Sequence, residues 1–266
     1  MVRLTKEQKD FYAKNGFIKL SNIYSNEDMD RLSKEYDDLF TRKNIDDMEA
    51  AWKGNDMKKQ ANFINYSVKS LHNLQMHSSI FTEFITNQNM LEALEDIMGT
   101  PNILLHHTKA HLKPPENGAP YLMHQDYHYF PFKNDSMVAV FIHLDDTTPE
   151  NGGLAVYPGS HLLGPQEDVG VIEKGESYHY LDQKKFPLEK ATPISAKKGE
   201  IVVFSYLLIH GSYLNLSERT RRMLLVQLMS ADDEPLKDVH KSPCQGLVLR
   251  GKNVTREGAM AKRFVA

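Results

Sequence analysis

A histidine and an aspartate separated by one residue, His124-Gln125-Asp126, constrain this 266-residue chain more than any other feature. The surrounding pattern favours a β-strand, in which residues i and i+2 project from one face about 7 Å apart. The spacing therefore predicts that an imidazole and a carboxylate converge on one point. A mononuclear non-haem Fe(II) centre needs such a pair and one more histidine, because two histidines and one carboxylate occupy one face of its octahedron.

The best candidate for the second histidine is His210, which lies 86 residues downstream of His124. It ends the apolar, β-branched run 201–209, which is typical of a buried strand that opens into a turn. Arg221 follows eleven residues later, far enough for a turn and the start of a returning strand. A planar, permanently charged guanidinium suits the far end of a dicarboxylate co-substrate.

Several short pieces of sequence follow one another in an order that has a known counterpart. They are Pro101-Asn-Ile, Lys113-Pro-Pro, His124 to Phe132, Asn151-Gly, Pro158-Gly-Ser-His161, Leu207 to Ser212, and Arg221. In these pieces the chain resembles the phytanoyl-CoA dioxygenase family of Fe(II)/2-oxoglutarate oxygenases. The resemblance implies that His124, Asp126 and His210 are the iron ligands, and that 2-oxoglutarate and O₂ are co-substrates.

The resemblance also implies roles around the co-substrate. The family spacing selects Arg221, rather than its neighbours Arg219 and Arg222, as the anchor of the distal carboxylate of 2-oxoglutarate. Ser212, two residues beyond His210, is predicted to add a hydroxyl there. Two further candidates are Phe141, which would pack on the co-substrate or be a plain core residue, and Lys109, at a position where the family places a residue that touches 2-oxoglutarate.

The remaining histidines are weaker candidates. On a regular strand His128 would share a face with His124, but i and i+4 lie about 13 Å apart. We therefore expect His128 to be a pocket-wall or hydrogen-bonding residue rather than a metal ligand. His107, Lys109 and His111 share one face of their strand, so all three point into the interior or none does.

Composition excludes several classes of protein. A net charge of −3 and a pI near 6.5 argue against a nucleic-acid groove. Cys244 is the only cysteine, so no intrachain disulfide is possible. The N-terminus lacks the apolar region of a signal peptide, the longest apolar runs are too short for a membrane span, and the C-terminus is not a peroxisomal signal. These features predict a cytoplasmic protein with a small-molecule partner and no membrane partner; they leave its oligomeric state open.

The order of patterns predicts one domain of mainly β structure with flanking helices. Residues 1–100 are predicted to form a mainly helical scaffold, with a capping box at Thr5, a strand at 16–20, and helices after Ser25 and over 80–98. The polar stretch 41–62 around Trp52 is predicted to be a loop or a frayed helix. Residues 101–232 read as a double-stranded β-helix, or jelly roll, and 233–266 as a C-terminal extension. The predicted strands are 102–112, 121–130, 137–144, 153–157, 193–196, 200–209 and 221–230, with an unstructured insertion at 162–192.

The sequence thus predicts an oxygenase that hydroxylates, or otherwise oxidises, an unactivated C–H bond of a small organic metabolite. The resemblance implies that 2-oxoglutarate is converted to succinate and CO₂. The main alternative is an acyl-CoA hydroxylase. A jelly-roll binding protein without catalysis and a hydrolytic zinc enzyme are the remaining alternatives, and neither assigns a task to Arg221.

Overall fold

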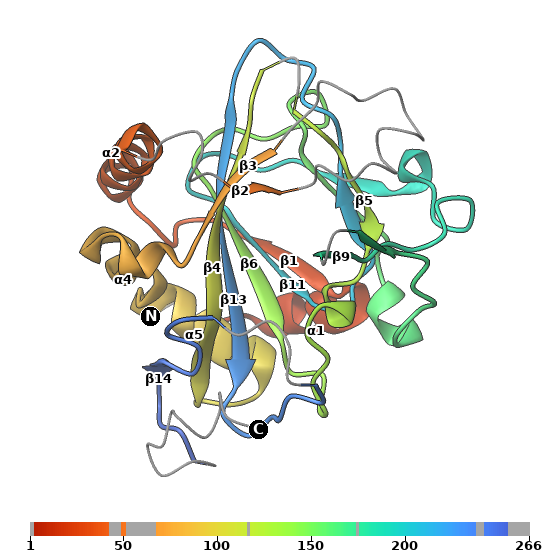
Figure 1. Ribbon diagram of the computed structural model, residues 1–266. Helices are drawn as coiled ribbons and strands as arrows, with labels where there is room; N and C mark the ends of the chain where they lie inside the picture. The colour runs from red at the N-terminus through yellow and green to blue at the C-terminus, as the bar shows by residue number, and fades with distance from the viewer. Residues whose placement is uncertain are drawn as a thin grey trace.

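The described part of the chain contains an eight-stranded and a four-stranded antiparallel sheet, a two-stranded hairpin, four α-helices and several short 3₁₀-helices (Figure 1). The structure is a computed structural model that describes residues 3–42, 49–51, 68–115, 118–173, 176–237 and 242–254. The helices are α1 (Lys6–Asn15), α2 (Asn26–Arg42), α4 (Ser79–Ile85) and α5 (Gln88–Met98). The strands are β1 (Phe17–Leu20), β2 (Glu49–Ala51), β3 (Val68–His72), β4 (Ile103–Lys113), β5 (Tyr121–His124), β6 (Val138–His143), β7 (Leu154–Val156), β8 (Val171–Glu173), β9 (Glu176–Tyr178), β10 (Thr192–Ile194), β11 (Ile201–Ser205), β12 (His210–Ser212), β13 (Arg221–Ser230) and β14 (Val248–Arg250).

The large sheet has the strand order β1-β11-β6-β13-β4-β3-β2, and β14 also pairs with β4. The small sheet has the order β10-β7-β12-β5, and β8 and β9 form a separate hairpin. This is the predicted jelly roll, with the helices of the N-terminal part packed on the large sheet. Strand β13 has the bounds that the sequence predicts.

Alternation of side chains along the strands of the large sheet separates two cores. One face, with Val140, Val203 and Leu224, packs against buried residues of α2, α4 and α5. The other face, with Val202 and Phe204, packs against the small sheet. Because directly opposed residues of antiparallel strands share a face, the register decides which polar side chains of β4 and β13 enter the space between the sheets.

Local signals explain where the N-terminal helices begin and end. The Thr5 hydroxyl accepts a hydrogen bond from the Gln8 backbone N–H, and the Gln8 side chain accepts one from the Thr5 N–H, which is the predicted capping box. The helix predicted over 80–98 is instead two helices, α4 and α5. They separate because the Asn87 side chain caps the N-terminus of α5 by accepting from the Met90 N–H.

Two other predictions concern loops. The stretch 162–192 is not without regular structure, because it contains β8, β9 and a 3₁₀-helix η5 at Leu188–Lys190. It is held by apolar burial, since Leu181 and Phe186 pack beside Met123 of the small sheet. Within the stretch 41–62 the structure describes only residues 41–42 and 49–51. Residues 41–42 end α2, and residues 49–51 form the strand β2 rather than part of a loop. Trp52 and its neighbours lie outside the described residues.

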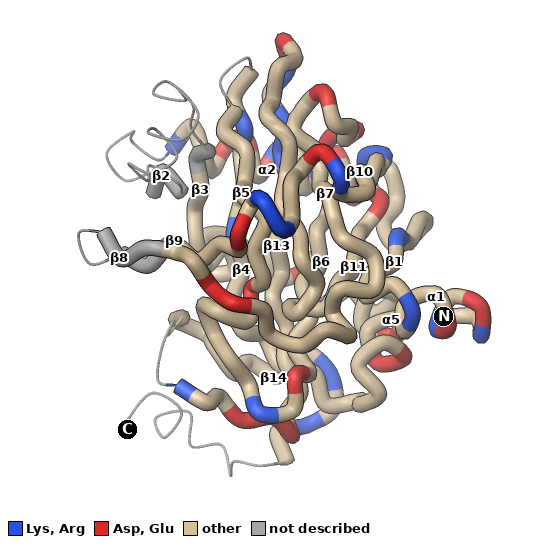
Figure 2. Tube along the Cα trace, turned by 90° about the vertical axis from the view of Figure 1, so that its right-hand side faces the viewer, with Lys and Arg blue, Asp and Glu red and all other residues tan. Residues whose placement is uncertain are grey.

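Two neighbouring strands of the large sheet, β6 and β11, carry no charged residue. Figure 2 shows β6 and β11 without acidic or basic residues, whereas both signs occur on the surrounding turns and helices. In the part of the chain that the structure describes, we find no helix that is long and apolar enough to cross a membrane.

Candidate active site

The two predicted histidine ligands lie directly opposite each other on neighbouring strands of the small sheet. His124 is the last residue of β5 and His210 is the first of β12, and the register pairs them. Their ring centroids are 4.2 Å apart. The strands therefore bring the two imidazoles together across 86 residues of sequence.

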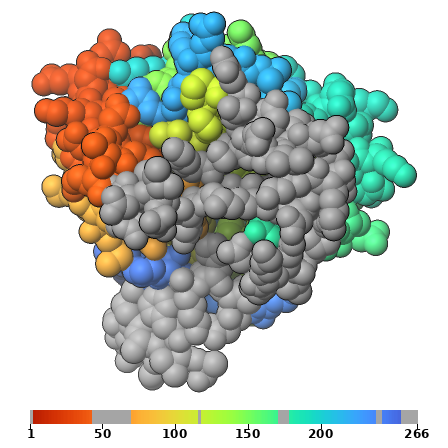
Figure 3. Space-filling view, turned by 45° about the horizontal axis from the view of Figure 1, so that its top comes forward, coloured from red at the N-terminus to blue at the C-terminus, as the bar shows by residue number. Residues whose placement is uncertain are grey.

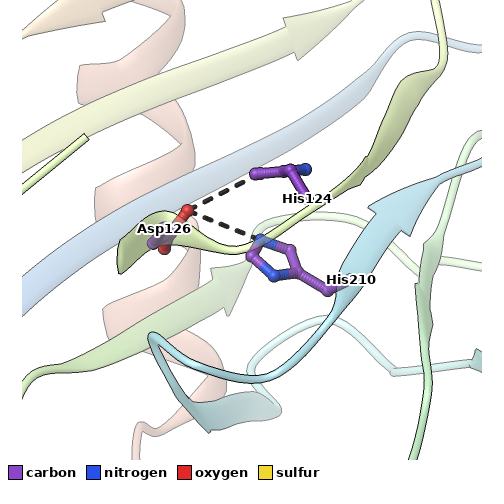
Figure 4. A group of neighbouring side chains, drawn as sticks. All are labelled: His124, Asp126 and His210. Carbon is purple, nitrogen blue, oxygen red and sulfur yellow. Dashed lines mark ion pairs between the residues drawn. The ribbon is translucent and has the colours of Figure 1, made fainter. Parts of the chain in front are cut away.

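Asp126 reaches the same point by a turn and not by strand alternation. Strand β5 ends at His124, Gln125 is still extended, and Asp126 begins the 3₁₀-helix η3 (Asp126–His128). The predicted strand 121–130 is thus too long, although the predicted convergence is present. Figure 4 shows the Asp126 carboxylate turned toward both imidazoles.

The spacing of the three side chains admits a single metal ion. Asp126 Oδ1 lies 3.6 Å from His124 Nε2 and 3.7 Å from His210 Nε2. One potential ligand atom from each residue lies within 4.8 Å of the other two. Two atoms bound at about 2.1 Å to a shared ion lie at most about 4.2 Å apart, so both distances to Asp126 are compatible with coordination.

Backbone carbonyls hold both imidazoles in the tautomer that a metal needs. His124 Nδ1 lies 2.7 Å from the Leu122 carbonyl oxygen, and His210 Nδ1 lies 2.9 Å from that of Leu208. A carbonyl oxygen only accepts, so each Nδ1 carries the proton and donates. Each Nε2 is left unprotonated, with its lone pair directed to the common centre. Histidines that bind metals in proteins usually donate their other ring N–H in this way.

The electrostatics of the cluster favour a neutral His210 imidazole beside an ionised Asp126 carboxylate. Burial lowers the pKa of His210 to about 4. Burial alone would raise the pKa of Asp126, but the His210 and His124 imidazoles and the Lys109 ammonium together hold it below its ordinary value. Two imidazoles and a carboxylate are the donor set that Fe(II) takes in oxygenases, so the residues present fit that ion.

Aromatic side chains form the wall next to His210. The Phe204 ring lies 4.7 Å from the His210 ring, and Phe141 meets Phe204 edge to face at 4.9 Å. Phe141 is half-buried on the inner face of the large sheet. It is opposite Leu225, whose partner on the other side is Lys109. Both predicted contacts of the co-substrate therefore lie in one row that faces the small sheet.

The basic residue predicted as an anchor points into the same interior. Arg221 is 4% exposed and donates through one terminal nitrogen to the Gly152 carbonyl oxygen at 2.8 Å. Arg222 faces the other way, where it pairs with Asp145 at 2.6 Å and also bonds Asp37. Arg219 is exposed. Of the three arginines, Arg221 alone is inside.

Other polar groups of β4 share this interior. His107, Lys109 and His111 pair with the inward-facing residues Gln227, Leu225 and Met223 of β13, so all three face inward. His111 Nδ1 lies 3.0 Å from the Tyr121 hydroxyl. None of the three joins the cluster of potential metal ligands, which within the described ranges is His124, Asp126 and His210.

His128 lies outside that cluster, as the sequence predicts. It ends η3 and stacks on His179, with ring centroids 6.1 Å apart. His179 in turn pairs through Nδ1 with Asp168 at 2.6 Å. Burial lowers the pKa of His128, which favours the neutral form of this ring.

The sequence reasoning assigned no role to Lys113, although it lies on the same strand face. It is fully buried and its ammonium donates to Ser212 Oγ at 2.6 Å. The alternation that places Lys109 and His111 inside extends by one more step to Lys113. That pattern was available in the sequence, and the register Lys113 to Arg221 completes it.

A jelly roll that carries two histidines and a carboxylate around one point, with a buried arginine in the same interior, defines the class of non-haem iron oxygenases that use 2-oxoglutarate. The model of the phytanoyl-CoA dioxygenase (PhyH) family matches residues 12–223, so the chain belongs to that family. It is an oxidoreductase, an Fe(II)/2-oxoglutarate-dependent dioxygenase with O₂ as the other co-substrate.

Individual relatives agree on the class and differ in what they act on. The chain is 26% identical over 240 residues to a probable alpha-ketoglutarate-dependent hypophosphite dioxygenase of Stutzerimonas stutzeri, covering 86% of this chain and 80% of that protein. It is 29% identical over 238 residues to the peroxisomal phytanoyl-CoA dioxygenase of Homo sapiens, covering 86% and 69%.

Solved structures share the fold at lower identity. The carbocyclase SnoK from nogalamycin biosynthesis has a TM-score of 0.72 at 18% identity, over 94% of this chain and 95% of that one. EctD from S. alaskensis with bound Fe has a TM-score of 0.67 at 17% identity, over 93% and 84%. These similarities support the jelly-roll fold, and the substrate must be inferred from the residues of this chain.

Proposed function

We propose that His124, Asp126 and His210 hold Fe(II), that Arg221 and Ser212 bind the distal carboxylate of 2-oxoglutarate, and that the enzyme hydroxylates a small polar metabolite. The observation that carries the proposal is the convergence of the three ligand atoms in the same interior that holds the buried Arg221. The reaction is RH + 2-oxoglutarate + O₂ → ROH + succinate + CO₂. When bound, iron and 2-oxoglutarate supply the activation of O₂.

The contribution of the chain is to bind, orient and shield. The carbonyls of Leu122 and Leu208 keep the two imidazoles aimed at the centre. Phe141 and Phe204 form an apolar wall that excludes water from the side of His210. Lys109 and Phe141 lie in one row of the large sheet, where they would flank the carbon chain of 2-oxoglutarate.

A buried amide supports a polar substrate. Gln227 is fully buried, and neither end of its amide has a hydrogen-bond partner among the described residues. It lies in the row Phe204, Ala139, Gln227, His107, which begins at the ring that contacts His210. An unpaired buried polar group costs about 1–3 kcal/mol. A ligand with a hydroxyl, amide or carboxylate would remove that cost, and an alkyl chain would not.

Charge supports a free metabolite over a CoA thioester. A CoA ester carries several phosphate charges that attract clustered lysines and arginines. The segment 165–190, which includes the hairpin β8-β9, has six acidic residues and four lysines, a net charge of −2. The second candidate, an acyl-CoA hydroxylase, is favoured by the names of several relatives.

One experiment separates the two candidates. Purified enzyme with Fe(II) is supplied with 2-oxoglutarate and O₂, and succinate is measured with branched acyl-CoAs in parallel with free acids, amino acids and small oxyanions. We expect succinate formation to rise most with a free polar compound. Turnover that is tightly coupled to an acyl-CoA alone would overturn the substrate proposal, and no succinate under any condition would overturn the role assigned to the site.

A further inference from the structure

Two buried basic side chains lie side by side at the end of the interior that Arg221 occupies. Lys113 of β4 is the direct register partner of Arg221 of β13, so both side chains enter from one face of the large sheet. Lys113 is 0% and Arg221 is 4% exposed. Neither has a carboxylate partner among the residues that the structure describes. Burying a charge without a counter-charge is costly, so this end of the interior is suited to an anion.

The contacts of Lys113 determine what the hydroxyl of Ser212 can do. Ser212 Oγ accepts from the Lys113 ammonium at 2.6 Å and from the Tyr121 backbone N–H at 3.2 Å. A hydroxyl has two acceptor positions and one proton to donate. Both acceptor positions of Ser212 are occupied, so its proton is left to donate to another group.

The backbone around Gly152 joins this arrangement to Arg221. The Gly152 carbonyl oxygen accepts from the Arg221 guanidinium at 2.8 Å. A Cβ at Gly152 would lie 2.8 Å from Lys113 Cδ and 3.2 Å from its Nζ. Lys113 and Arg221 therefore approach the same short piece of backbone, and the buried Nε of Arg221 has no hydrogen-bond partner within the described residues.

We propose that Lys113 is a positioning residue for the distal carboxylate of 2-oxoglutarate. Its ammonium holds Ser212 so that the hydroxyl donates to the carboxylate, and it places a second positive charge beside Arg221. This inference rests on the proposed function and adds a residue to it. It also implies that the co-substrate site binds an anion with two cations rather than one.

A second consequence is a proton taken up on binding. The titratable groups that face the Lys113 ammonium are Arg221 of β13, Tyr121 of β5, with its ring centroid 5.6 Å away, and His111 of β4; β12 contributes Ser212 and the carbonyl of Tyr213. Burial, and then the Arg221 charge, lower the pKa of Lys113 well below its ordinary value. A bound carboxylate opposes both effects, because a nearby negative charge favours the protonated amine.

The test is isothermal titration of 2-oxoglutarate, without O₂, into the enzyme loaded with Mn(II). Each titration is done in two buffers of different ionisation enthalpy, between about pH 7 and 9. We expect the wild-type enzyme to take up protons on binding within this pH range. Lys113→Met should bind about ten- to a hundredfold more weakly and lose the uptake.

Three controls make the result specific. Lys19→Met removes an exposed lysine that also donates to a backbone carbonyl, that of Ser195, and should leave the affinity for 2-oxoglutarate unchanged. Ser212→Ala should weaken binding, and adding it to Lys113→Met should cost less than the sum of the two changes, because the two groups act together. If Lys113→Met does not fold, the proton uptake of the wild type and the affinity of Ser212→Ala for 2-oxoglutarate still test the role of Lys113.

The outcomes separate this inference from the proposed function. Unchanged affinity in Lys113→Met, or wild-type binding without proton uptake throughout the pH range, would overturn the role of Lys113 while leaving the role of the site intact. Failure of the metal-loaded wild type to bind 2-oxoglutarate would overturn both.

Discussion

His124 and His210 face each other as direct partners on β5 and β12, so the register of two short strands decides whether the metal centre exists. A slip by one residue would turn one imidazole to the opposite face of the sheet. Gly211 supports the close approach, because a Cβ there would lie 2.7 Å from the Tyr121 carbonyl oxygen and 2.8 Å from Met123 Sδ. The site is therefore a property of strand pairing as much as of its ligands.

Replacing Asp126 with Ala should lower the affinity for Fe(II) by more than about a hundredfold and abolish succinate formation. The reason is that even outer partners of metal ligands are worth ten- to a hundredfold, and a ligand is worth more. The melting temperature should change little, since Asp126 belongs to none of the apolar cores. Asp146→Ala, which removes an exposed carboxylate paired with Lys197, is the matched control. Full activity in Asp126→Ala would refute the ligand assignment.

Replacing Arg221 with Lys should raise the KM for 2-oxoglutarate by about ten- to a hundredfold, because the charge remains but the bidentate fork is lost. The same change at Arg222 should leave the KM nearly constant. It should instead reduce the free energy of unfolding by roughly 1 kcal/mol through weaker bonding to Asp145 and Asp37. Steady-state kinetics and urea unfolding of both variants check this. A larger rise in KM for Arg222→Lys than for Arg221→Lys would contradict the assignment of Arg221 as the anchor of 2-oxoglutarate.

Gly152→Ala and Gly99→Ala form a matched pair. Both glycines have a positive φ, +85° and +67°, so an alanine strains the backbone at each position. Only at Gly152 would the new methyl group press on Lys113 and the Tyr213 carbonyl oxygen. We expect both variants to lose about 1 kcal/mol of stability, and Gly152→Ala alone to bind 2-oxoglutarate more weakly. Equal affinity of the two variants for 2-oxoglutarate would contradict the proposal that its distal carboxylate binds beside Lys113 and Arg221.

His143 should make the protein sensitive to mild acid. Burial, and then the Arg221 charge, lower its pKa to about 4, against an ordinary value near 6.5. Between these values the unfolded chain binds the extra proton, so the folded state loses stability as the pH falls, by up to roughly 3 kcal/mol. His143→Gln should show a flatter dependence of the free energy of unfolding between about pH 6.5 and 4. Parallel slopes for variant and wild type in urea unfolding would count against this prediction.

Local patterns predicted those elements whose signals are complete within a few residues. The capping box at Thr5 starts α1, and the period-two run of β13 has the predicted bounds. The sequence predicted the three candidate iron ligands as a set because an octahedral face accepts few combinations of side chains. The break between α4 and α5 was missed, although Asn87 is a recognisable N-cap, because apolar positions continue at helical spacing on both sides.

The order of residues along β4, β5 and β13 by itself determines which side chains share a face of the sheet. It puts Lys109 and Lys113 on one face, and it puts Arg221 and Arg222 on opposite faces. Alternation could not determine which strands become neighbours. Strand pairing joins segments about a hundred residues apart, and the packing of the whole sheet must offset the entropy lost when such a long loop closes. Only the tertiary structure therefore paired Lys113 with Arg221 and His124 with His210. It also ended β5 at His124, so that a turn rather than a strand carries Asp126 to the centre.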